Sequence, residues 1–408
     1  MHLNTQRSCA NSSLQVRTIL PSGRGRRALL GLAVVVLGTA ACSTAVRPGT
    51  AGSAAVAAQA GQTAHRPFLL RFHTVGQVAA TVPANGDVNP YGVAVIRQTA
   101  GRLISGDTLV SNFNSKANVQ GRGTTIVEIS PDGAARLFAR LSALPSSDSC
   151  PGGVGLTTGL VVLPGGWVVV GSLPTTARGG IPAVNPTGCL IVLDSRGRPV
   201  ETWVSRDISG PWDMTARATA GHAALFVSNV LARSGGAHSA PPPAGLCTVV
   251  RLDIALAPGP RPRMTTATIV GTGFRWRQNT AALVQGPTGL ALGRDGTLYV
   301  ASTTDSSISA IPDAVTRNSA AAPAATVLTS GGSLNGPLGL TLAPGGDLIA
   351  LNGNDGNAVE ITPRGRQVAT VTLVPHGAGD LFGVTTPADG QGLLFVNDGT
   401  NALDLFSG

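Results

Sequence analysis

The sequence predicts an all-β fold, a six-bladed β-propeller of four-stranded antiparallel blades that an N-terminal strand closes by completing the last blade. Three observations predict it: a motif that recurs six times, glycine-bearing turns between short apolar runs, and a last repeat that is one strand short. The 408 residues include 54 Gly and 28 Pro, and 43% are apolar while only 12% are charged. That composition favours many short strands around a large core over helices.

Each repeat begins with a small or turn residue, often followed by Pro, and then a glycine that opens an apolar run. Five segments follow this pattern, at residues 89–93, 157–160, 286–290, 336–340 and 380–384. A sixth segment, residues 210–214, carries Asp213 where the other five carry glycine. Self-similarity of this kind is the sequence mark of a repeat architecture.

Turn signals separate the apolar runs within each repeat. Asp-Gly or Gly-Gly pairs at 165–166, 295–296 and 345–346 predict hairpin turns, because glycine reaches positive φ without steric cost. Four antiparallel strands in each of six repeats make a six-bladed propeller. Equivalent positions are 44 to 76 residues apart, and a blade needs about 40–45. We therefore expect the excess in loops, the longest over residues 233–246 and 258–282.

The two ends of the repeat region predict how the ring closes. The last repeat, residues 381–408, is long enough for three strands only, and an unassigned strand-like piece lies before the first blade at residues 75–83. If that piece is the outer strand of the last blade, it removes an exposed edge and locks the ring. An open solenoid would explain neither the strand missing from the last repeat nor the extra strand-like piece before the first blade.

The layout of residues 75–408, with Pro-x-Gly-apolar openings and second strands that end in Asn or Asp, resembles NHL repeats. The Asn-His-Arg signature that names those repeats is absent, so the resemblance implies an architecture more than a functional subfamily. Six-bladed lactonases, amidating lyases and streptogramin-inactivating lyases are similar folds. Their chemistry implies metal-binding or acid/base side chains at the channel, but their residues do not map onto this sequence.

The N-terminal segment has the features of an export signal. Basic residues at 24–27 precede the apolar run 28–41, which as a helix would rise about 21 Å, too short to span a bilayer. Cys42 follows a sequence that resembles a bacterial lipobox, in which the cysteine is diacylated; ordinary cleavage with an unmodified Cys42 is the alternative. The export route, twin-arginine or general, stays open. We expect a signal peptide over 1–41, a lipid-anchored tether over 42–66, the propeller over 67–408, and a location at the outer face of the cytoplasmic membrane or another envelope membrane.

The net charge of +9 does not indicate a nucleic-acid partner. Seven of the 29 basic residues, and no acid, lie within residues 1–66, which leaves 22 basic against 20 acidic residues in the propeller. A basic stripe for phosphates is therefore not predicted.

Three cysteines remain in the exported domain. Cys150 precedes the first strand of the second blade and Cys189 opens its third strand, so both fit one rim and we expect a disulfide in an oxidising compartment. Cys247 is then unpaired, and we expect a buried apolar role for it. No Cys or His spacing indicates zinc.

Propeller binding sites usually lie at the channel mouth, where the first strands begin. The candidate ligand residues there are Asn89, Tyr91, Thr158, Trp212, Asp213, Thr288, Asn335 and Phe382. The competing interpretation is that the amides serve tight turns and that Asp213 pairs with a backbone amide of the next blade. No catalytic motif occurs, so no catalytic residue and no cofactor is predicted, with a channel calcium or zinc ion left open.

Taken together, the sequence favours an exported, lipid-anchored, monomeric propeller that acts as a non-catalytic binding module or scaffold. Its partner would be a protein, a glycan or a small molecule. The alternative is a metal-assisted lyase or lactonase-type hydrolase with its site at the propeller channel, an interpretation that depends on fold analogy and on Asp213.

Overall fold

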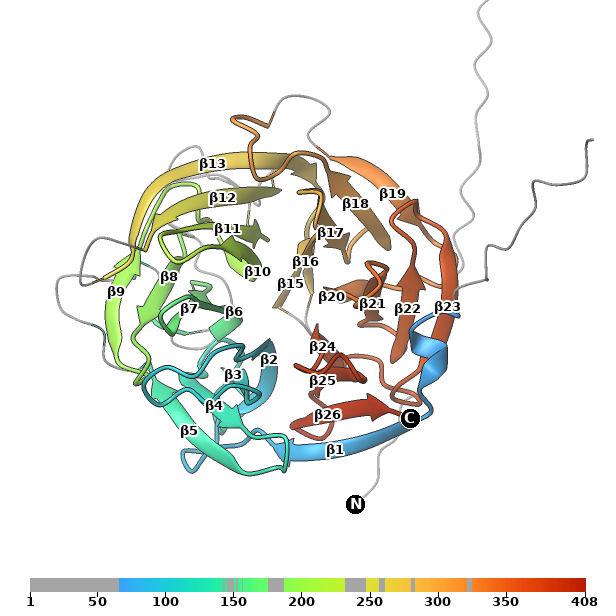
Figure 1. Ribbon diagram of the computed structural model, residues 1–408, viewed down its shortest axis with the longest axis horizontal. Coiled ribbons are helices and arrows are strands. Elements are labelled where there is room, and N and C mark those ends of the chain that lie inside the picture. Colours follow the sequence, from blue (N-terminus) through green and yellow to red (C-terminus); the bar gives the residue numbers. More distant parts are fainter. Residues whose placement is uncertain are drawn as a thin grey trace, which may run out of the picture. The chain divides into compact units, whose positions relative to one another are not determined.

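The computed structural model describes residues 66–141, 144, 150, 151, 153–155, 157–174, 187–231, 247–256, 261–279, 283–320 and 325–408. Within these ranges the chain forms six four-stranded antiparallel sheets around a common axis, and a separate two-stranded hairpin (Figure 1). The predicted all-β, six-bladed propeller is confirmed. The expected signal peptide, Cys42 and the tether up to residue 65 lie outside the described residues.

The blades follow one another along the chain, each from an inner to an outer strand. Blade 1 contains β2 (Val88–Val95), β3 (Thr108–Asn114), β4 (Thr125–Ile129) and β5 (Ala135–Arg140). Blade 2 contains β6 (Thr157–Leu163), β7 (Trp167–Ser172), β8 (Cys189–Leu193) and β9 (Pro199–Trp203). Blade 3 contains β10 (Pro211–Ala218), β11 (His222–Asn229), β12 (Cys247–Ala255) and β13 (Arg263–Phe274).

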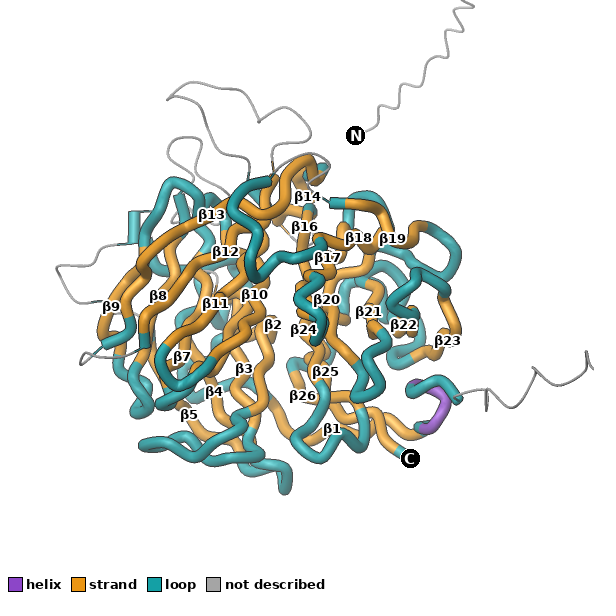
Figure 2. Tube along the Cα trace, turned by 45° about the horizontal axis from the view of Figure 1, so that its top comes forward, coloured by secondary structure: helices purple, strands orange, loops and turns teal. Residues whose placement is uncertain are grey.

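The hairpin of β14 (Arg277–Asn279) and β15 (Leu283–Gln285) leads into the second half of the ring. Blade 4 contains β16 (Pro287–Leu292), β17 (Leu298–Ser302), β18 (Ser307–Ile311) and β19 (Thr326–Ser330). Blade 5 contains β20 (Pro337–Leu342), β21 (Leu348–Asn352), β22 (Asn357–Ile361) and β23 (Gln367–Thr372). Strand and loop make up almost all of this region, as Figure 2 shows; the described helix is the three-residue 3-10 turn η1 (Leu69–Arg71). No helix in the described part of the chain is long and apolar enough to cross a bilayer.

Blade 6 combines both ends of the propeller. It contains β24 (Leu381–Thr385), β25 (Leu393–Asn397) and β26 (Ala402–Ser407), and β1 (Thr74–Ala80) pairs antiparallel with β26 at the rim (Figure 1). The strand expected over residues 75–83 thus lies over 74–80, as the outer strand of this blade. Just before it, the backbone N–H groups of Phe68 and Leu69 each donate a 2.8 Å hydrogen bond to the carboxylate of Glu360 in blade 5.

The core is divided into apolar layers between neighbouring blades. Leu109 of blade 1 packs in one layer with Val168 of blade 2, and Phe226 of blade 3 packs in another with Val300 of blade 4. All four side chains are fully buried. Burial at this level stabilises a folded chain by roughly 1.5–3 kcal/mol for each large aliphatic or aromatic side chain.

The repeated glycine lets the inner strands approach one another. A Cβ atom on Gly339 would lie 2.0 Å from the carbonyl oxygen of Phe382 in the next blade, and one on Gly383 would lie 2.2 Å from that of Tyr91. Backbone cannot yield to so close a contact. Glycine recurs at this position because only a residue without a Cβ atom lets neighbouring inner strands come this close.

One loop expectation is wrong. Residues 258–282, expected as a surface loop, include β13, the twelve-residue outer strand of blade 3, and β14. The stretch from Arg263 to Phe274 is rich in Thr, Ile and Val, residues that favour pleated strands, and the Pro-rich residues before it hid the signal. The other expected loop, 233–246, lies outside the described residues.

Asparagine side chains at the ends of second strands fix the segments that lead into their blades. The Asn112 amide donates to the carbonyl of Thr81 and to Thr125 Oγ1, and the Asn229 amide donates to the carbonyl of Asp207 and to Thr248 Oγ1. Both asparagines are fully buried. These two carboxamides are structural, although they bond the leading segments and do not form the tight turns that the sequence suggested for such residues.

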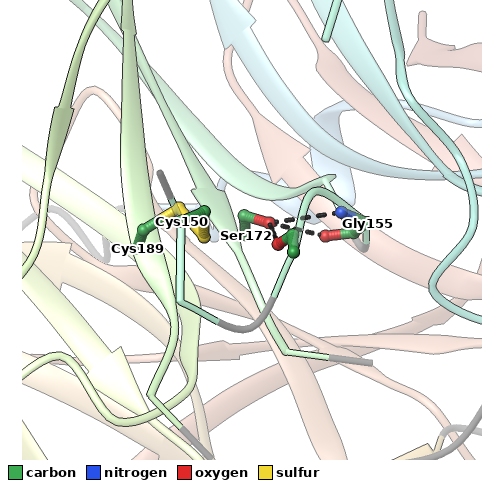
Figure 3. The surroundings of a disulfide bond; sticks show 5 residues. Cys150, Gly155, Ser172 and Cys189 are labelled. Atoms are coloured by element: carbon green, nitrogen blue, oxygen red, sulfur yellow. Dashed lines mark hydrogen bonds between the residues drawn. A yellow bond between two sulfur atoms is a disulfide. The ribbon is translucent and has the colours of Figure 1, made fainter. Parts of the chain in front are cut away.

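Blade 2 replaces this amide clamp with a covalent bond. Cys150, which precedes the blade, and Cys189 of β8 form a disulfide with their Cα atoms 5.5 Å apart, beside Ser172 (Figure 3). Ser172 Oγ donates to the carbonyl of Gly155 at 2.8 Å. The third cysteine, Cys247, is free and buried, and burial raises the pKa of its thiol to about 12.

Candidate functional site

An aromatic layer fills the channel at the level where the inner strands begin. The Tyr91 ring lies 5.2 Å from that of Trp212 and 5.3 Å from that of Phe382, and Phe113 lies 5.9 Å from Trp212. Tyr91, Trp212 and Phe382 are exposed by only 3%, 1% and 7%. These three candidate ligand residues are therefore core residues, because packing on one another buries more apolar surface than lining an open channel would.

The two candidate threonines connect blades. Thr158 Oγ1 donates to the carbonyl of Pro211 in blade 3 at 3.0 Å, and Thr288 Oγ1 contacts Thr303 Oγ1 at 2.8 Å and the carbonyl of Pro337 in blade 5 at 3.3 Å. Both threonines are fully buried. Their hydroxyl groups hold the ring together and do not reach a ligand.

Asp213 lies inside the ring, below the aromatic layer. Its Oδ2 accepts a hydrogen bond from the backbone N–H of Leu290 in blade 4 at 2.9 Å. It borders an enclosed cavity of about 20 Å³, next to Tyr91 and the inner glycines, with room for about one water molecule. Burial raises the pKa of Asp213 to about 7, although the N–H groups of Leu290 and Met214 lower it. Asp213, which is partly buried, is thus a structural group whose charge changes near neutral pH.

The last two candidates lie at the mouth of the channel. Asn89 has a φ of 59°, and its Nδ2 donates to Asp398 Oδ2 at 3.0 Å. Its Oδ1 is buried and has no hydrogen-bond partner among the described residues. Asn335 is exposed, and its Oδ1 accepts a 3.1 Å hydrogen bond from Asn354.

Their hydrogen-bond partners, Asp398 and Asn354, line a cavity of about 410 Å³ over blades 5 and 6, which we call the mouth cavity. Leu338 and Phe382 belong to its apolar lining, which we call its apolar floor, and Leu338 also lines the small cavity beside Asp213. Its polar lining comes from Asp380, Asp398, Asn354 and Gln285. A few convergent polar groups over an apolar floor are the usual character of a small-molecule site.

Asp380 and Asp398 are the ionisable groups of the mouth cavity. The backbone N–H of Asp398 donates to the carbonyl of Asp380 at 2.8 Å, which fixes the two residues side by side. Burial and then the charge of Asp380 raise the pKa of Asp398 to about 6, and burial raises that of Asp380. Acids of raised pKa in a cleft are candidates for proton transfer near neutral pH.

Sequence reasoning did not select this pair, although one signal was present. Asp380 stands where Gly210, Gly286 and Gly336 stand in other repeats, the same kind of departure that drew attention to Asp213. Asp398 follows a second strand and looked like an ordinary turn residue. Its proximity to Asp380 depends on the closure of the last blade, which sequence spacing does not give.

The mouth cavity has few of the side chains that bind metal ions. The described residues contain no group of three or more His, Cys, Asp or Glu side chains that could hold one. Calcium takes six to eight oxygen ligands, whereas the mouth cavity supplies two carboxylates, one of which already accepts from Asn89. These donors do not make a complete metal site, so no chemical step is derived through a metal.

No known family model and no curated protein matches this chain. Solved structures do. A gluconolactonase from Xanthomonas campestris is 15% identical with a TM-score of 0.50, over 83% of this chain and 90% of its own. A calcium-binding regucalcin from Agrobacterium tumefaciens is 12% identical with a TM-score of 0.49, over 81% of this chain and 92% of its own. A virginiamycin B lyase from Staphylococcus aureus is 16% identical with a TM-score of 0.45, over 82% of this chain and 88% of its own.

These likenesses correct one interpretation made from the sequence. The propeller was interpreted first as a non-catalytic binding module or scaffold, because no catalytic motif occurs. The gluconolactonase, which has a TM-score of 0.50, is instead named for an enzyme. The enzymatic alternative is therefore the better supported of the two. At these identities the likeness itself shows the fold alone.

Proposed function

We propose that the propeller is a hydrolase that opens lactones or related small esters at the mouth cavity, with Asp398 and Asp380 as its acid and base. The observation that carries the proposal is the placement of these two acids side by side over an apolar floor. Like charges held close together cannot both ionise easily, so one carboxyl keeps its proton where the other has lost it. Such a pair supplies an acid and a base at once.

In the proposed reaction the Asp380 carboxylate takes a proton from a water molecule while the water oxygen adds to the acyl carbon. Protonated Asp398 gives its proton to the ring oxygen as the acyl C–O bond breaks. One water is consumed and one hydroxy acid is formed, and the two aspartates return to their starting states by proton exchange with solvent. Asn89, which donates to Asp398 Oδ2, orients that carboxyl.

The test is a hydrolysis assay of the full chain on a series of five- and six-membered lactones, with spontaneous hydrolysis subtracted. Because Asp398 must be protonated and its pKa is about 6, we expect kcat/KM to fall as the pH rises through 6. Asp398→Asn and Asp380→Asn should each lower kcat/KM by about 10²–10⁴-fold. Asp389→Asn, at an exposed acid outside the mouth cavity, is the control.

Two results would oppose the proposal: no lactone opened faster than in buffer, or full activity in both mouth-cavity variants. Formation of an unsaturated product without uptake of water would instead indicate a lyase at the same acids. Added calcium that raises activity through Asp380 and Asp398 would indicate a metal-assisted form of the reaction.

We also propose that the chain is exported and lipid-anchored through Cys42, as an NHL-like repeat protein of the cell envelope. The lipobox-like sequence before Cys42 supports this, and the disulfide between Cys150 and Cys189 fits an oxidising compartment. Metabolic labelling with palmitate should mark the wild-type chain and not Cys42→Ala. An unlabelled wild type would disprove the anchor.

A further inference from the structure

A second cavity, of about 390 Å³, lies between blades 3 and 4, away from the mouth cavity. We call it the interblade cleft. It lies between the end of β13 on one side and β18 with β19 on the other, strands that are neighbours at the rim in Figure 1. The polar side chains that line it are those of Thr272, Arg275, Ser302, Asp305, Ser307, Ser309 and Ser330.

Ser302, which lines the cleft, stands where blade 5 has its asparagine clamp. In blade 5, Asn352 at the end of the second strand bonds the carbonyl of Ser333 and the N–H of Asn335, in the segment that leads into the blade. The equivalent residue of blade 4 is Ser302, whose shorter side chain bonds Asp305 in its own turn at 2.9 Å. No amide then crosses to the leading segment, and space remains.

Two hydroxyl groups on β18 line this space without hydrogen bonds to the described side chains. Ser307 and Ser309, two apart on β18, share one face of the sheet, and they are exposed by only 4% and 5%. Both line the cleft, and neither hydroxyl has a side-chain hydrogen bond among the described residues. Because no described side chain of the protein occupies them, these two hydroxyl groups are free to donate to and accept from a group that enters the cleft.

The other side chains that line the cleft indicate which kind of ligand it would bind. Arg275 and Asp305 lie 3.7 Å apart at the opening, so the cleft carries one charge of each sign. Val327, unusually exposed at 59%, adds an apolar surface. Hydroxyl groups both donate and accept, and a sugar presents hydroxyl groups around an apolar ring face. We propose that the interblade cleft binds a neutral mono- or disaccharide.

The test is saturation-transfer NMR on the full chain with glucose, maltose and trehalose as probes. We expect transfer to at least one sugar, and at least tenfold weaker binding in the Ser307→Ala/Ser309→Ala variant. Ser302→Asn should abolish binding by placing an amide like that of Asn352 inside the cleft. Ser105→Ala, at an exposed serine far from the cleft in the sequence and absent from its lining, should bind as wild type does.

The alanine variants should keep the wild-type melting temperature, because their hydroxyls make no internal side-chain hydrogen bond. Weaker binding then reports the cleft and not the fold. The proposal is overturned if none of the three sugars shows transfer, if binding survives both cleft variants, or if inorganic phosphate displaces the sugars, which would make the cleft an anion site of Arg275. Lactone hydrolysis at the mouth cavity is a separate readout, so either proposal can fail alone.

Discussion

Asp213 Oδ2 in blade 3 accepts a hydrogen bond from the backbone N–H of Leu290 in blade 4, across 2.9 Å. The five equivalent positions in the other repeats are glycine, so this side-chain link belongs to one blade interface. Burial raises the pKa of Asp213 to about 7. The bond therefore holds two blades together through a group that changes charge near neutral pH.

The first prediction follows from that charge. Between the ordinary Asp pKa of 3.8 and about 7, the folded chain binds a proton at Asp213 that the unfolded chain has lost, so the free energy of unfolding falls as the pH rises through this window. The loss from Asp213 is on the order of 2–4 kcal/mol. Asp213→Asn keeps an oxygen for Leu290 without the charge, and should reduce the decline in urea unfolding between pH 5 and 8 by that amount. The control variant Asp389→Asn should show the same decline in the free energy of unfolding as the wild type. If Asp213→Asn also shows the full decline, Asp213 is ionised throughout this pH range.

The second prediction concerns the inner glycines. Gly383→Ala would place Cβ 2.2 Å from the carbonyl oxygen of Tyr91, and backbone on both sides prevents relief. We expect a loss of about 3 kcal/mol or more in the free energy of unfolding. The matched control is Gly76→Ala on β1, where a Cβ meets nothing within 4 Å; it should change the stability by less than about 1 kcal/mol. Equal losses at both positions would contradict the close-approach argument.

The fold was largely predictable because its signals are local. Glycine-bearing turns and short apolar runs mark each blade, and the surplus strand before blade 1 matches the strand that blade 6 lacks. The failure at residues 258–282 has a local cause too, since Pro-rich residues precede a strand of twelve residues. Loop length along the chain says little about where a strand resumes.

The candidate site was less predictable because its geometry is not local. Tyr91, Trp212 and Phe382 begin inner strands, where polar or aromatic residues could line a channel, but only the assembled ring shows that they fill it. Asp380 and Asp398 are separated in the sequence by two strands, β24 and β25, and meet through a backbone hydrogen bond at the mouth. Their raised pKa values arise from burial that no sequence pattern records.

The third prediction tests how Asn89 acts on Asp398. The Asn89 amide donates to the Asp398 carboxylate at 3.0 Å, and a donor of this kind favours the charged form. Asn89→Gly removes the amide while glycine accepts the φ of 59°. We expect the pKa of Asp398 to rise further above about 6, as followed by carboxyl carbon NMR. Asn118→Gly, at another asparagine of positive φ, should leave it in place, and an unchanged pKa in Asn89→Gly would mean that the amide does not act on this carboxyl.

The fourth prediction concerns the disulfide of blade 2. It closes a loop of 39 residues between Cys150 and Cys189, and removing such a crosslink costs about 4 kcal/mol on the chain-entropy estimate. Cys150→Ser/Cys189→Thr should therefore unfold at a lower urea concentration than the wild type. Dithiothreitol should destabilise the wild type and leave this variant unchanged; a wild type that is insensitive to reduction would mean that the bond does not stabilise the propeller.

The same blade allows the amide clamp to be rebuilt. Ser172 and Cys189 pair in register as Asn229 and Thr248 do in blade 3, where the Asn229 amide bonds Thr248 Oγ1 and the leading segment. Adding Ser172→Asn to the Cys150→Ser/Cys189→Thr variant should raise its free energy of unfolding by about 1 kcal/mol, the usual net contribution of one hydrogen bond. Ser172→Asn in the wild type, where the disulfide already holds the segment, should give no gain. If the triple variant is no more stable than the double variant, the disulfide does not stand in for the clamp, and blade 2 is held by another means.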